Sequence, residues 1–485
     1  MTRLLPALAT LGPREAELPW PRHRLDGRGW LGLLAMLAQE DWTLVALFAD
    51  GTDIHLALRD ESDGTQGLAR YAAPSRRFPS VGRVRPGAIR LERAIRDIHG
   101  IEAEEAPDLR PWLDHGGSAY TFLPVEGEGV HQIPVGPVHA GIIEPGHFRF
   151  HANGELIVRL EERLGYTHKG IEALTIGRTP IEAARLAARV SGDSTVAHSL
   201  AFARAVEQAL ATAAPARAAW LRALMAELER IANHFGDFAA ICNDATFTLI
   251  HAHATTARER VLQACETSFG HRLMMDRVVP GGVSADLPPD APARIARLID
   301  DSERTLAYLY RIYESKPSLL DRTVSTGVTL SELVHRFGAG GFVGRAAGRA
   351  VDARKSPGYP PYDGLEFDVP LSLEADVHAR LTIRIQEMRQ SFRLIRQILE
   401  RLPDGEVHVE LPVGRGDGIA MVESFRGDVF AYVRLDDAGR VARYHPRDPS
   451  WFQWPLLEAA VEGNIVADFP LINKSFNGSY AGHDL

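Results

Sequence analysis

Residues 215–244 form the stretch that most strongly limits the folds open to this chain. Their sequence, PARAAWLRALMAELERIANHFGDFAAICND, repeats Ala, Leu, Ile and Phe at helical spacing. Pro215 suits a helix start, where its missing N–H is not needed. A helix of this length that is apolar around so much of its circumference has to pack against several neighbours. The stretch therefore predicts the central helix of a bundle.

Other segments also predict helices. Residues 178–270 and 290–315 are rich in Ala, Leu and Arg with helical periodicity, and residues 375–402 continue the pattern. TLSELVHRF, residues 329–337, reads as a short helix. From about Val407 up to the stretch GNIVADFPLINKSFNGSYAGHDL we expect a β-rich region.

The N-terminal region has a different pattern. WTLVALFAD and DIHLALRD are apolar runs joined by the turn pair Asp50-Gly51, which predicts a β-hairpin. The helical stretch RLERAIRDIHG follows and ends at Gly100. A second hairpin is expected about Asn153-Gly154, for the same reason of turn chemistry.

These patterns predict an α+β protein of two domains, since 485 residues exceed what one core usually serves. We expect a small α+β domain over residues 1–118 and a Gly- and Pro-rich linker over residues 119–135. The second domain, residues 136–485, is expected to be a mainly α-helical bundle with flanking β-hairpins.

Composition excludes several classes of function. The net charge is −9 and no long run of Lys or Arg occurs, so nucleic acid is not expected as a partner. The apolar run WLGLLAMLAQEDWTLVALF is broken by charges, and the N-terminus does not read as a signal peptide. We therefore expect a cytoplasmic protein that meets a membrane only through partner subunits.

Cysteine usage limits the cofactors. Cys242 and Cys265 are the two cysteines of the chain, too few for a four-cysteine zinc or iron–sulfur site. We expect both to be small buried apolar residues rather than a disulfide.

The histidines do not predict a metal site, because their surroundings are turns and strands; they stand at positions 131, 139, 147, 151, 251 and 253. GAGGFVG, residues 338–344, lacks the G-x-G-x-x-G spacing and follows a helix, so it is read as a packing loop.

Two groups of polar residues remain open to a proton-transfer role. In YTHKGIEAL, His168 could donate a proton near neutral pH and Glu172 could relay one, or both could belong to a hydrogen-bonded junction without chemistry. On the long helix, Glu227, Glu229 and Asp237 could form an internal proton path. The alternative is that they are salt-bridge partners of neighbouring arginines such as Arg222 and Arg230.

RVSGDSTVAHSLAF, residues 189–202, raises a related question. Ser191, Asp193 and Ser194 precede an apolar helical run, so their oxygens could cap the first N–H groups of that helix. Side chains three apart on one face could also occupy positions built for a heavier group.

Taken together, the ordered blocks resemble one superfamily. YTHKGIEAL, RVSGDSTVAHSLAF, LMAELERIANHFGD, RVVPGGVSADLP, GRAAGRAVDARKSPGYPPYDGLEFDVP, RIQEMRQSFRLIRQILERLPDGE and VESFRGDVFAYV are similar to blocks of the complex I 49 kDa-type subunit and of membrane-bound NiFe hydrogenase large subunits. LERAIRDIHGIEAEEAPDLRPWL resembles the 30 kDa-type subunit of complex I, fused in front as in formate hydrogenlyase and hydrogenase-4. The resemblance covers about residues 85–485 and implies a hydrogenase large-subunit-like fold.

The resemblance also shows what this chain lacks. The hydrogenase motif R-x-C-G-x-C falls on residues 189–194 with Ser191 and Ser194 at the cysteine positions, and D-P-C-x-x-C falls on residues 473–478 with Ser475 and Gly478 there. A thiol has a pKa of about 8.5 and becomes a soft thiolate ligand, whereas a serine hydroxyl is a much weaker acid and a hard ligand. We therefore expect no NiFe centre, no metal in this chain and no hydrogen activation. The same chemistry disfavours an active hydrogenase with unusual ligands.

A quinone site is the second implication. The resemblance places His168 near a quinone head group, while the position of a complex I tyrosine falls on Arg189, a cation that could still hydrogen-bond a quinone carbonyl. It also implies that further charged residues line the emptied cavity. The candidate site residues are His168, Glu172, Arg189, Asp193, Asp352 and Arg354.

The resemblance implies a multisubunit complex on the cytoplasmic face of the inner membrane. Its partners would be a small iron–sulfur subunit, a ferredoxin-like subunit and antiporter-like membrane subunits. The chain would take part in electron transfer to a quinone-like or other acceptor and in coupling to ion translocation, and alone it would be inactive. NADH:quinone oxidoreductase activity and NAD binding are family properties, but the chain shows no nicotinamide site. The alternative is a non-catalytic scaffold that docks the iron–sulfur subunit on the membrane arm.

Overall fold

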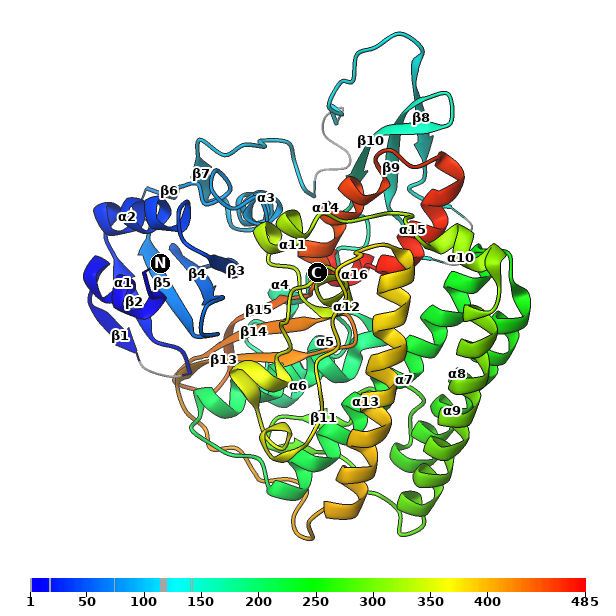
Figure 1. The fold of residues 1–485 in the computed structure, drawn as a ribbon. Helices are drawn as coiled ribbons and strands as arrows, with labels where there is room; N and C mark the ends of the chain where they lie inside the picture. Colours follow the sequence, from blue (N-terminus) through cyan, green and yellow to red (C-terminus); the bar gives the residue numbers. More distant parts are fainter. Residues whose placement is uncertain (1, 17–18, 74, 114–119, 140, 142) are drawn as a thin grey trace.

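The computed structural model describes residues 2–16, 19–73, 75–113, 120–139, 141 and 143–485. Residues up to 104, called the N-terminal domain below, contain helices and a sheet and lie beside a larger, mainly helical part of the chain, called the helical domain (Figure 1). A small sheet projects next to the C-terminal helices. This is the predicted fold class. Among the described residues, no helix combines the length and the apolar character that crossing a membrane requires.

The N-terminal domain is built on a five-stranded sheet. Its order is β1-β2-β5-β4-β3, with β2 and β5 parallel and the other pairs antiparallel. The predicted hairpin is confirmed, because Asp50 pairs with Asp53 across Gly51. The elements are α1 (Leu4–Leu11), β1 (Arg14–Ala16), β2 (Arg22–Leu25), α2 (Gly27–Leu37), β3 (Trp42–Asp50), β4 (Asp53–Asp60), β5 (Gln66–Ala72), β6 (Arg77–Pro79), α3 (Ala88–His99) and β7 (Glu102–Glu104).

Part of the predicted linker is a strand. Residues 130–135 form β8 (Val130–Val135), which pairs with β9 (His147–Asn153), and β9 turns at Asn153-Gly154 into β10 (Leu156–Arg163). The second predicted hairpin is thereby confirmed, while the predicted boundary between residues 118 and 119 lies outside the described residues. The Gly and Pro residues around β8 obscure the alternation of apolar and polar residues that would predict a strand.

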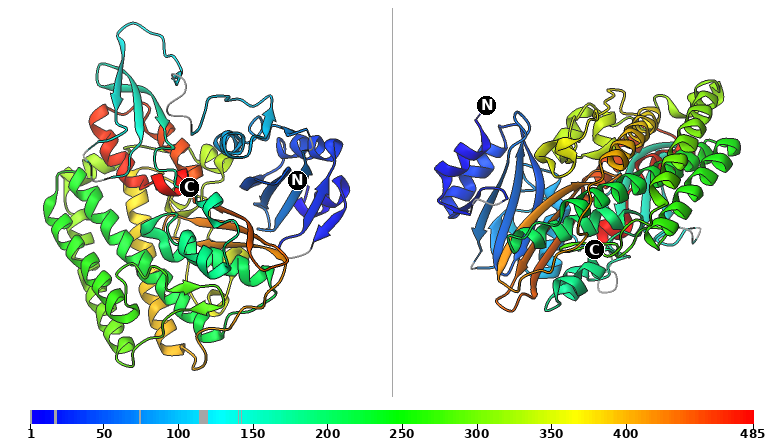
Figure 2. Two further views of the ribbon diagram at one scale, coloured as in Figure 1. Left: turned by 180° about the vertical axis from the view of Figure 1, so that it is seen from behind. Right: turned by 90° about the horizontal axis from the view of Figure 1, so that it is seen from below.

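The helical domain is a bundle of long helices against a three-stranded sheet. The central helix is α7 (Ala216–Asp244). It packs on α8 (Thr248–Phe269), α13 (Val377–Arg401) and α15 (Phe469–Phe476). Helix α6 (Thr195–Ala209) covers the sheet formed by β13 (Gly416–Glu423), β14 (Asp428–Leu435) and β15 (Val441–Arg447) (Figure 2). The helices before the sheet are α4 (Ile171–Thr175), α5 (Pro180–Ala187), α6 (Thr195–Ala209), α8 (Thr248–Phe269), α9 (Ala291–Glu314), α10 (Pro317–Thr323), α11 (Ser331–Phe337), α12 (Gly341–Ala346) and α13 (Val377–Arg401). The strands are β11 (Val278–Val279), β12 (Gly282–Val283), β13 (Gly416–Glu423), β14 (Asp428–Leu435) and β15 (Val441–Arg447).

The C-terminal expectation was wrong beyond residue 447. The chain there forms helices α14 (Ser450–Val461), α15 (Phe469–Phe476) and α16 (Tyr480–Asp484). Trp451, Trp454 and Leu457 of α14 are all buried. A helix enclosed on nearly all sides has no polar face, so its sequence carries no helical period and cannot be told from a buried strand.

Arginines of β15 join the two domains. Arg443 Nε donates to the carbonyl of Ala49 at 2.8 Å, and Arg447 Nε donates to the carbonyl of Val45 at 2.8 Å. Ala49 and Val45 lie on β3, the edge strand of the N-terminal sheet. The side chains thus satisfy edge carbonyls that a further strand would otherwise pair with.

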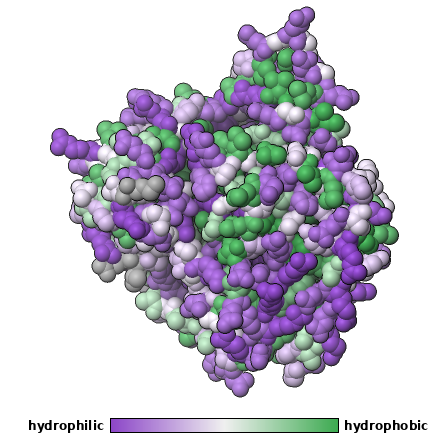
Figure 3. Space-filling model, viewed as in Figure 1, coloured by the Kyte–Doolittle hydropathy of each residue, from purple (hydrophilic) through white to green (hydrophobic). Residues whose placement is uncertain are grey.

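Apolar residues gather in the middle of the face seen in Figure 3. Exposed apolar side chains include Leu330 at 65% and Leu373 at 80%, and the loops that carry them are joined by a bond from Thr329 N to the carbonyl of Ala375. Such exposure is typical of a surface that contacts another protein.

Candidate functional site

Two segments that are distant in sequence enclose a cavity of about 320 Å³. One is the short helix η1 (Gly192–Ser194) before α6, and the other is the end of α15 with the residues that follow. Its polar lining includes Ser191, Asp193, Arg426, Lys474, Asn477 and Ser479. The structure therefore brings together the two motif regions of the sequence.

The oxygens of the first segment do not cap α6. Ser191 Oγ lies 2.9 Å from Asp193 Oδ1 and 2.8 Å from Ser479 Oγ, so it belongs to the cavity wall. Ser194 precedes α6 but makes no side-chain cap bond. The N–H groups of Val196 and Ala197 are instead accepted by the Glu229 carboxylate of α7, at 2.7 and 3.3 Å. The capping interpretation of this segment was therefore wrong.

Asp193 and Arg426 form the charged centre of the cavity. Arg426 Nη1 and Nη2 donate to the two oxygens of Asp193 at 2.7 and 2.5 Å, and Arg426 Nε donates to the carbonyl of Asn477. Burial acts to raise the pKa of Asp193, but the guanidinium outweighs it and lowers that pKa. The pair is a bidentate contact, and its further hydrogen bonds go to Ser191 and to the carbonyl of Asn477 in the cavity wall.

The former ligand positions do not fit a NiFe centre. Ser475 Oγ accepts from Arg380 Nε at 2.9 Å and donates to the carbonyl of Ile472 at 2.6 Å, so its hydroxyl is already engaged. A Cβ at Gly478 would stand 2.7 Å from Trp454 Cε2, closer than side chains approach. Among the described residues, no group of three or more His, Cys, Asp or Glu side chains could hold a metal ion. Hard hydroxyls in these surroundings offer no thiolate cage.

Three of the predicted site residues lie away from this cavity. His168 Nδ1 is 2.7 Å from the carbonyl of Asp484, and Glu172 contacts Arg443 and His445 at 3.0 and 2.7 Å. Arg189 forms an ion pair with Asp276 on the surface. These residues tie α4 to the C-terminus and to β15, and α5 to the segment after α8.

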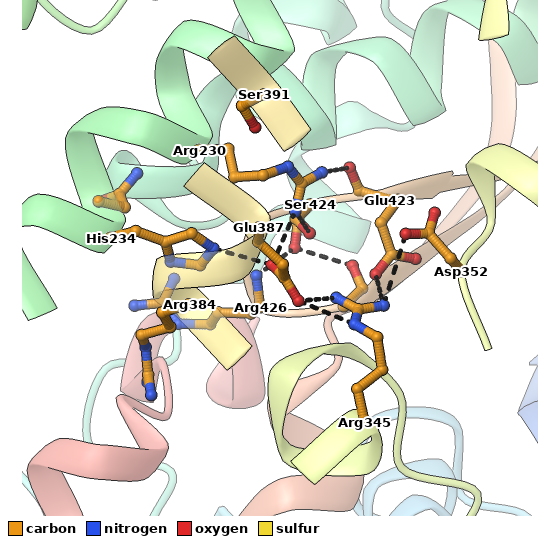
Figure 4. A network of polar contacts seen from close by, with 12 residues as sticks. Arg230, His234, Arg345, Asp352, Arg384, Glu387, Ser391, Glu423, Ser424 and Arg426 are labelled. Atoms are coloured by element: carbon orange, nitrogen blue, oxygen red, sulfur yellow. Dashed lines mark hydrogen bonds and ion pairs between the residues drawn. The ribbon is translucent and has the colours of Figure 1, made fainter. Parts of the chain in front are cut away.

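Asp352 and Arg354 belong to a buried ion-pair network rather than to the cavity lining. Arg354 Nη2 donates to Asp352 at 2.7 Å, and Arg354 Nη1 donates to Glu227 of α7 at 2.9 Å. In the adjoining part of the network, Arg345 reaches Glu387 and Glu423, both at 2.8 Å (Figure 4). The expectation that all six candidates surround one cavity was therefore wrong, since Asp193 alone of the six contributes to its lining.

The network accounts for two of the carboxylates on α7 whose role the sequence left undecided. Glu227 pairs with Arg354 and lies 3.4 Å from Arg230, and Asp237 Oδ2 accepts from Arg384 at 2.9 Å. The salt-bridge alternative describes these two residues. Glu229 is different: within the described parts of the chain it makes no ion pair, although it is buried.

Sequence reasoning missed the polar residues that complete the cavity. Arg426 stands inside the block VESFRGDVFAYV, and Lys474 and Asn477 stand inside the second motif region. A search for charged residues within the matched blocks would have found Arg426. Ser479 carried no signal, because only its contact with Ser191 marks it.

The two cysteines are free and buried, as predicted. Burial raises the pKa of the Cys265 thiol to about 12 and also raises that of Cys242. Neither thiol is therefore available as a thiolate at neutral pH.

Comparison with known proteins relates the chain to redox complexes. The model of the "Respiratory-chain NADH dehydrogenase, 49 Kd subunit" matches residues 245–415 and 408–484, and that of "Nickel-dependent hydrogenase" matches residues 169–242. The carbon monoxide-induced hydrogenase of Rhodospirillum rubrum is 32% identical over 350 residues, which cover 72% of this chain and 97% of that protein. Formate hydrogenlyase subunit 5 of Escherichia coli (strain K12) is 29% identical over 436 residues, covering 84% of this chain and 77% of the relative. A chain of the membrane-bound sulfane sulfur reductase, an archaeal respiratory membrane complex, superposes with a TM-score of 0.70 and 26% identity, over 75% of this chain and 100% of that one.

Proposed function

Because the chain belongs to the family of complex I 49 kDa-type subunits and nickel-dependent hydrogenase large subunits, we propose that it is the large subunit in the soluble arm of a membrane-bound oxidoreductase complex. The similar solved structure is itself part of a respiratory membrane complex. The partners proposed are a small iron–sulfur subunit, a ferredoxin-like subunit and antiporter-like membrane subunits. The complex would lie on the cytoplasmic face of the inner membrane, and the exposed apolar residues about Leu330 and Leu373 would meet a partner.

The cavity between residues 191–193 and 473–480 is the proposed redox site. The observation that carries this proposal is the bidentate Asp193–Arg426 pair in a polar cavity. The cavity lies where this chain has serine and glycine in place of the cysteines of the family motif. Electrons would come from the iron–sulfur cluster of the partner. A quinone-like molecule is the acceptor that the family favours, and sulfane sulfur is a second acceptor suggested by the similar structure.

The cavity residues can serve such an acceptor directly. Reduction places negative charge on an oxygen or sulfur atom, which the cations of Arg426 and Lys474 would stabilise. Ser191 and Asn477 can hydrogen-bond the acceptor. Asp193, whose pKa Arg426 lowers, can pass a proton on to the acceptor without retaining it. His168 would act only from outside the cavity, through its contact with the C-terminal segment.

Lys474→Met and Asp193→Asn in the purified complex test this proposal, with turnover followed against quinone and against sulfane sulfur. We expect each variant to lower turnover at least about tenfold, with nickel at background in every sample. Glu303→Gln, an exposed residue of α9, is the matched control. Nickel near one atom per complex, or unchanged turnover in both cavity variants, would contradict the proposal. Unchanged turnover in His168→Ala would remove only the indirect role of His168.

A scaffold role is the second candidate. The observation that favours it is that Asp352, Arg354 and Glu172 are all engaged in buried ion pairs, as structural residues are. A scaffold predicts silent cavity variants but loss of assembly in Leu330→Glu and Leu373→Glu.

A further inference from the structure

Glu229 is a buried carboxyl that the ion-pair network does not use. It lies in the middle of α7, 6% exposed, and its oxygens accept the N–H groups of Val196 and Ala197 at the start of α6. Other buried carboxylates of the helical domain, such as Glu227 and Glu387, each contact an arginine. Glu229 therefore has to carry its charge without an ion-pair partner among the described residues, or remain protonated.

A second, much smaller cavity lies against Glu229. Its volume is about 10 Å³, which is close to the space that one water molecule needs. Glu229 and Asn233 line it from α7, and Arg258 and Cys265 line it from α8. Asp193 lines this small cavity and the 320 Å³ cavity as well.

One residue that lines the small cavity is partly exposed to solvent. Arg272, in the segment after α8, contributes to its lining, and the Arg272 side chain is 43% exposed. Asn233 Nδ2 donates to the carbonyls of Asp193 and of Glu229 at 2.8 and 2.9 Å, which fixes the two segments relative to each other. Glu229 thus stands between the surface near Arg272 and the proposed redox cavity.

We propose that Glu229 exchanges protons between solvent and the redox cavity, by way of one water in the small cavity and the carboxylate of Asp193. This inference rests on the proposed function, because two-electron reduction of the acceptor consumes two protons there while the partner's iron–sulfur cluster supplies the electrons. In each transfer the O–H bond of Glu229 breaks, and the proton passes through the water to Asp193 and then to the reduced acceptor. Glu229 then regains a proton from solvent, which reaches it through the part of the small cavity that Arg258 and Arg272 line.

The electrostatics suit this task. Burial raises the pKa of Glu229 to about 8, since the two backbone N–H bonds lower it only in part. The charged and titratable groups that face it are Asp193 from η1, Arg230 on α7 itself, Arg258 and Cys265 from α8, and Arg272. Asp193 adds to the rise and Arg230 opposes it. A group with a pKa near the working pH both gives up and regains a proton readily.

Glu229→Gln and Ala232→Val in the purified complex test the proposal. Ala232 lines the small cavity, so a valine there displaces the water and leaves Glu229 in place. We expect both variants to lower turnover about tenfold to a hundredfold at pH 7. We expect wild-type turnover to decline above pH 8, where Glu229 loses its proton, and this decline should be absent in Glu229→Gln. In infrared titration, a protonated carboxyl band with a midpoint near pH 8 should be present in the wild type and absent in Glu229→Gln.

Glu92→Gln is the matched control. Glu92 is likewise buried and accepts N–H groups, those of Val81 and Gly82, but it lies in the N-terminal domain. If Glu229→Gln keeps the turnover and the pH profile of the wild type while Asp193→Asn is impaired, the inference is overturned and the proposed function still stands. If Asp193→Asn and Lys474→Met were also unimpaired, the proposed function would fall as well. If Glu229→Gln does not assemble, wild-type turnover in Ala232→Val overturns the inference.

Discussion

Ser191 Oγ lies 2.8 Å from Ser479 Oγ, although the two residues are 288 positions apart. The bond joins the segment before α6 to the segment before α16, the two regions where the hydrogenase family carries its metal ligands. Each hydroxyl has a second contact, to Asp193 Oδ1 and to Gly482 N. Hydrogen bonds of these two hydroxyls therefore close the cavity wall at the place where the hydrogenase family carries its metal ligands.

This closed wall predicts that cysteines introduced at the four ligand positions do not bind nickel. In the variant with Ser191→Cys, Ser194→Cys, Ser475→Cys and Gly478→Cys, we expect nickel at background in elemental analysis of the purified complex. The reason is that Arg380 holds the side chain at position 475 and Trp454 fills the space at position 478. Nickel at one atom per complex in this variant would show that the surroundings still accept the centre.

Gly478→Ala alone is predicted to destabilise the fold by about 1–3 kcal/mol. The added Cβ would meet the Trp454 ring at 2.7–2.8 Å, and this ring is buried and cannot move away. Urea denaturation measures the loss. Gly27→Ala is the control, because a Cβ there meets nothing within 4 Å, and an equal change in both variants would remove the steric explanation.

Much of the fold could be predicted from local sequence patterns. Asp50-Gly51 marked the turn between β3 and β4, and the wide apolar face of residues 215–244 marked α7. Helix α14 could not be predicted, because burial on all sides erases the period that distinguishes a helix from a strand.

The candidate site was harder to predict than the fold. Asp193 and the serine positions were found because motif spacing places them, and the structure sets Asp193 in the cavity wall. Asp352 and Arg354 were assigned to the cavity from their block, but sequence does not show that an Arg two positions after an Asp folds back onto it. Arg426 was overlooked because its partner Asp193 lies 233 positions away.

Glu387→Gln is predicted to lower the free energy of unfolding by about 3–5 kcal/mol at pH 7, because it leaves Arg345 buried with one carboxylate fewer. Burial acts to raise the pKa of Glu387, but Arg345 and His234 outweigh it and lower that pKa. The stabilisation is therefore present above the ordinary pKa of 4.5 and is lost as the pH falls below it toward the lowered pKa of the folded state. Denaturation between pH 3 and pH 7 should show the two proteins converging at acid pH. Glu303→Gln, exposed on α9, should match the wild type at every pH.

Glu229 predicts the opposite pH dependence. Its pKa is raised from 4.5 to about 8 in the folded protein, so between these values the folded state binds a proton that the unfolded state has lost. The free energy of unfolding should therefore fall as the pH rises from 5 to 8, by roughly 3–5 kcal/mol at most, and level off above. Glu229→Gln removes this slope, so the variant should unfold at a higher temperature than the wild type at pH 9 and at a similar temperature near pH 5. Glu266→Gln, exposed on α8, should keep the wild-type slope. Parallel curves for Glu229→Gln and the wild type would mean that Glu229 is ionised throughout this range, and the proton-exchange role would lose its electrostatic basis.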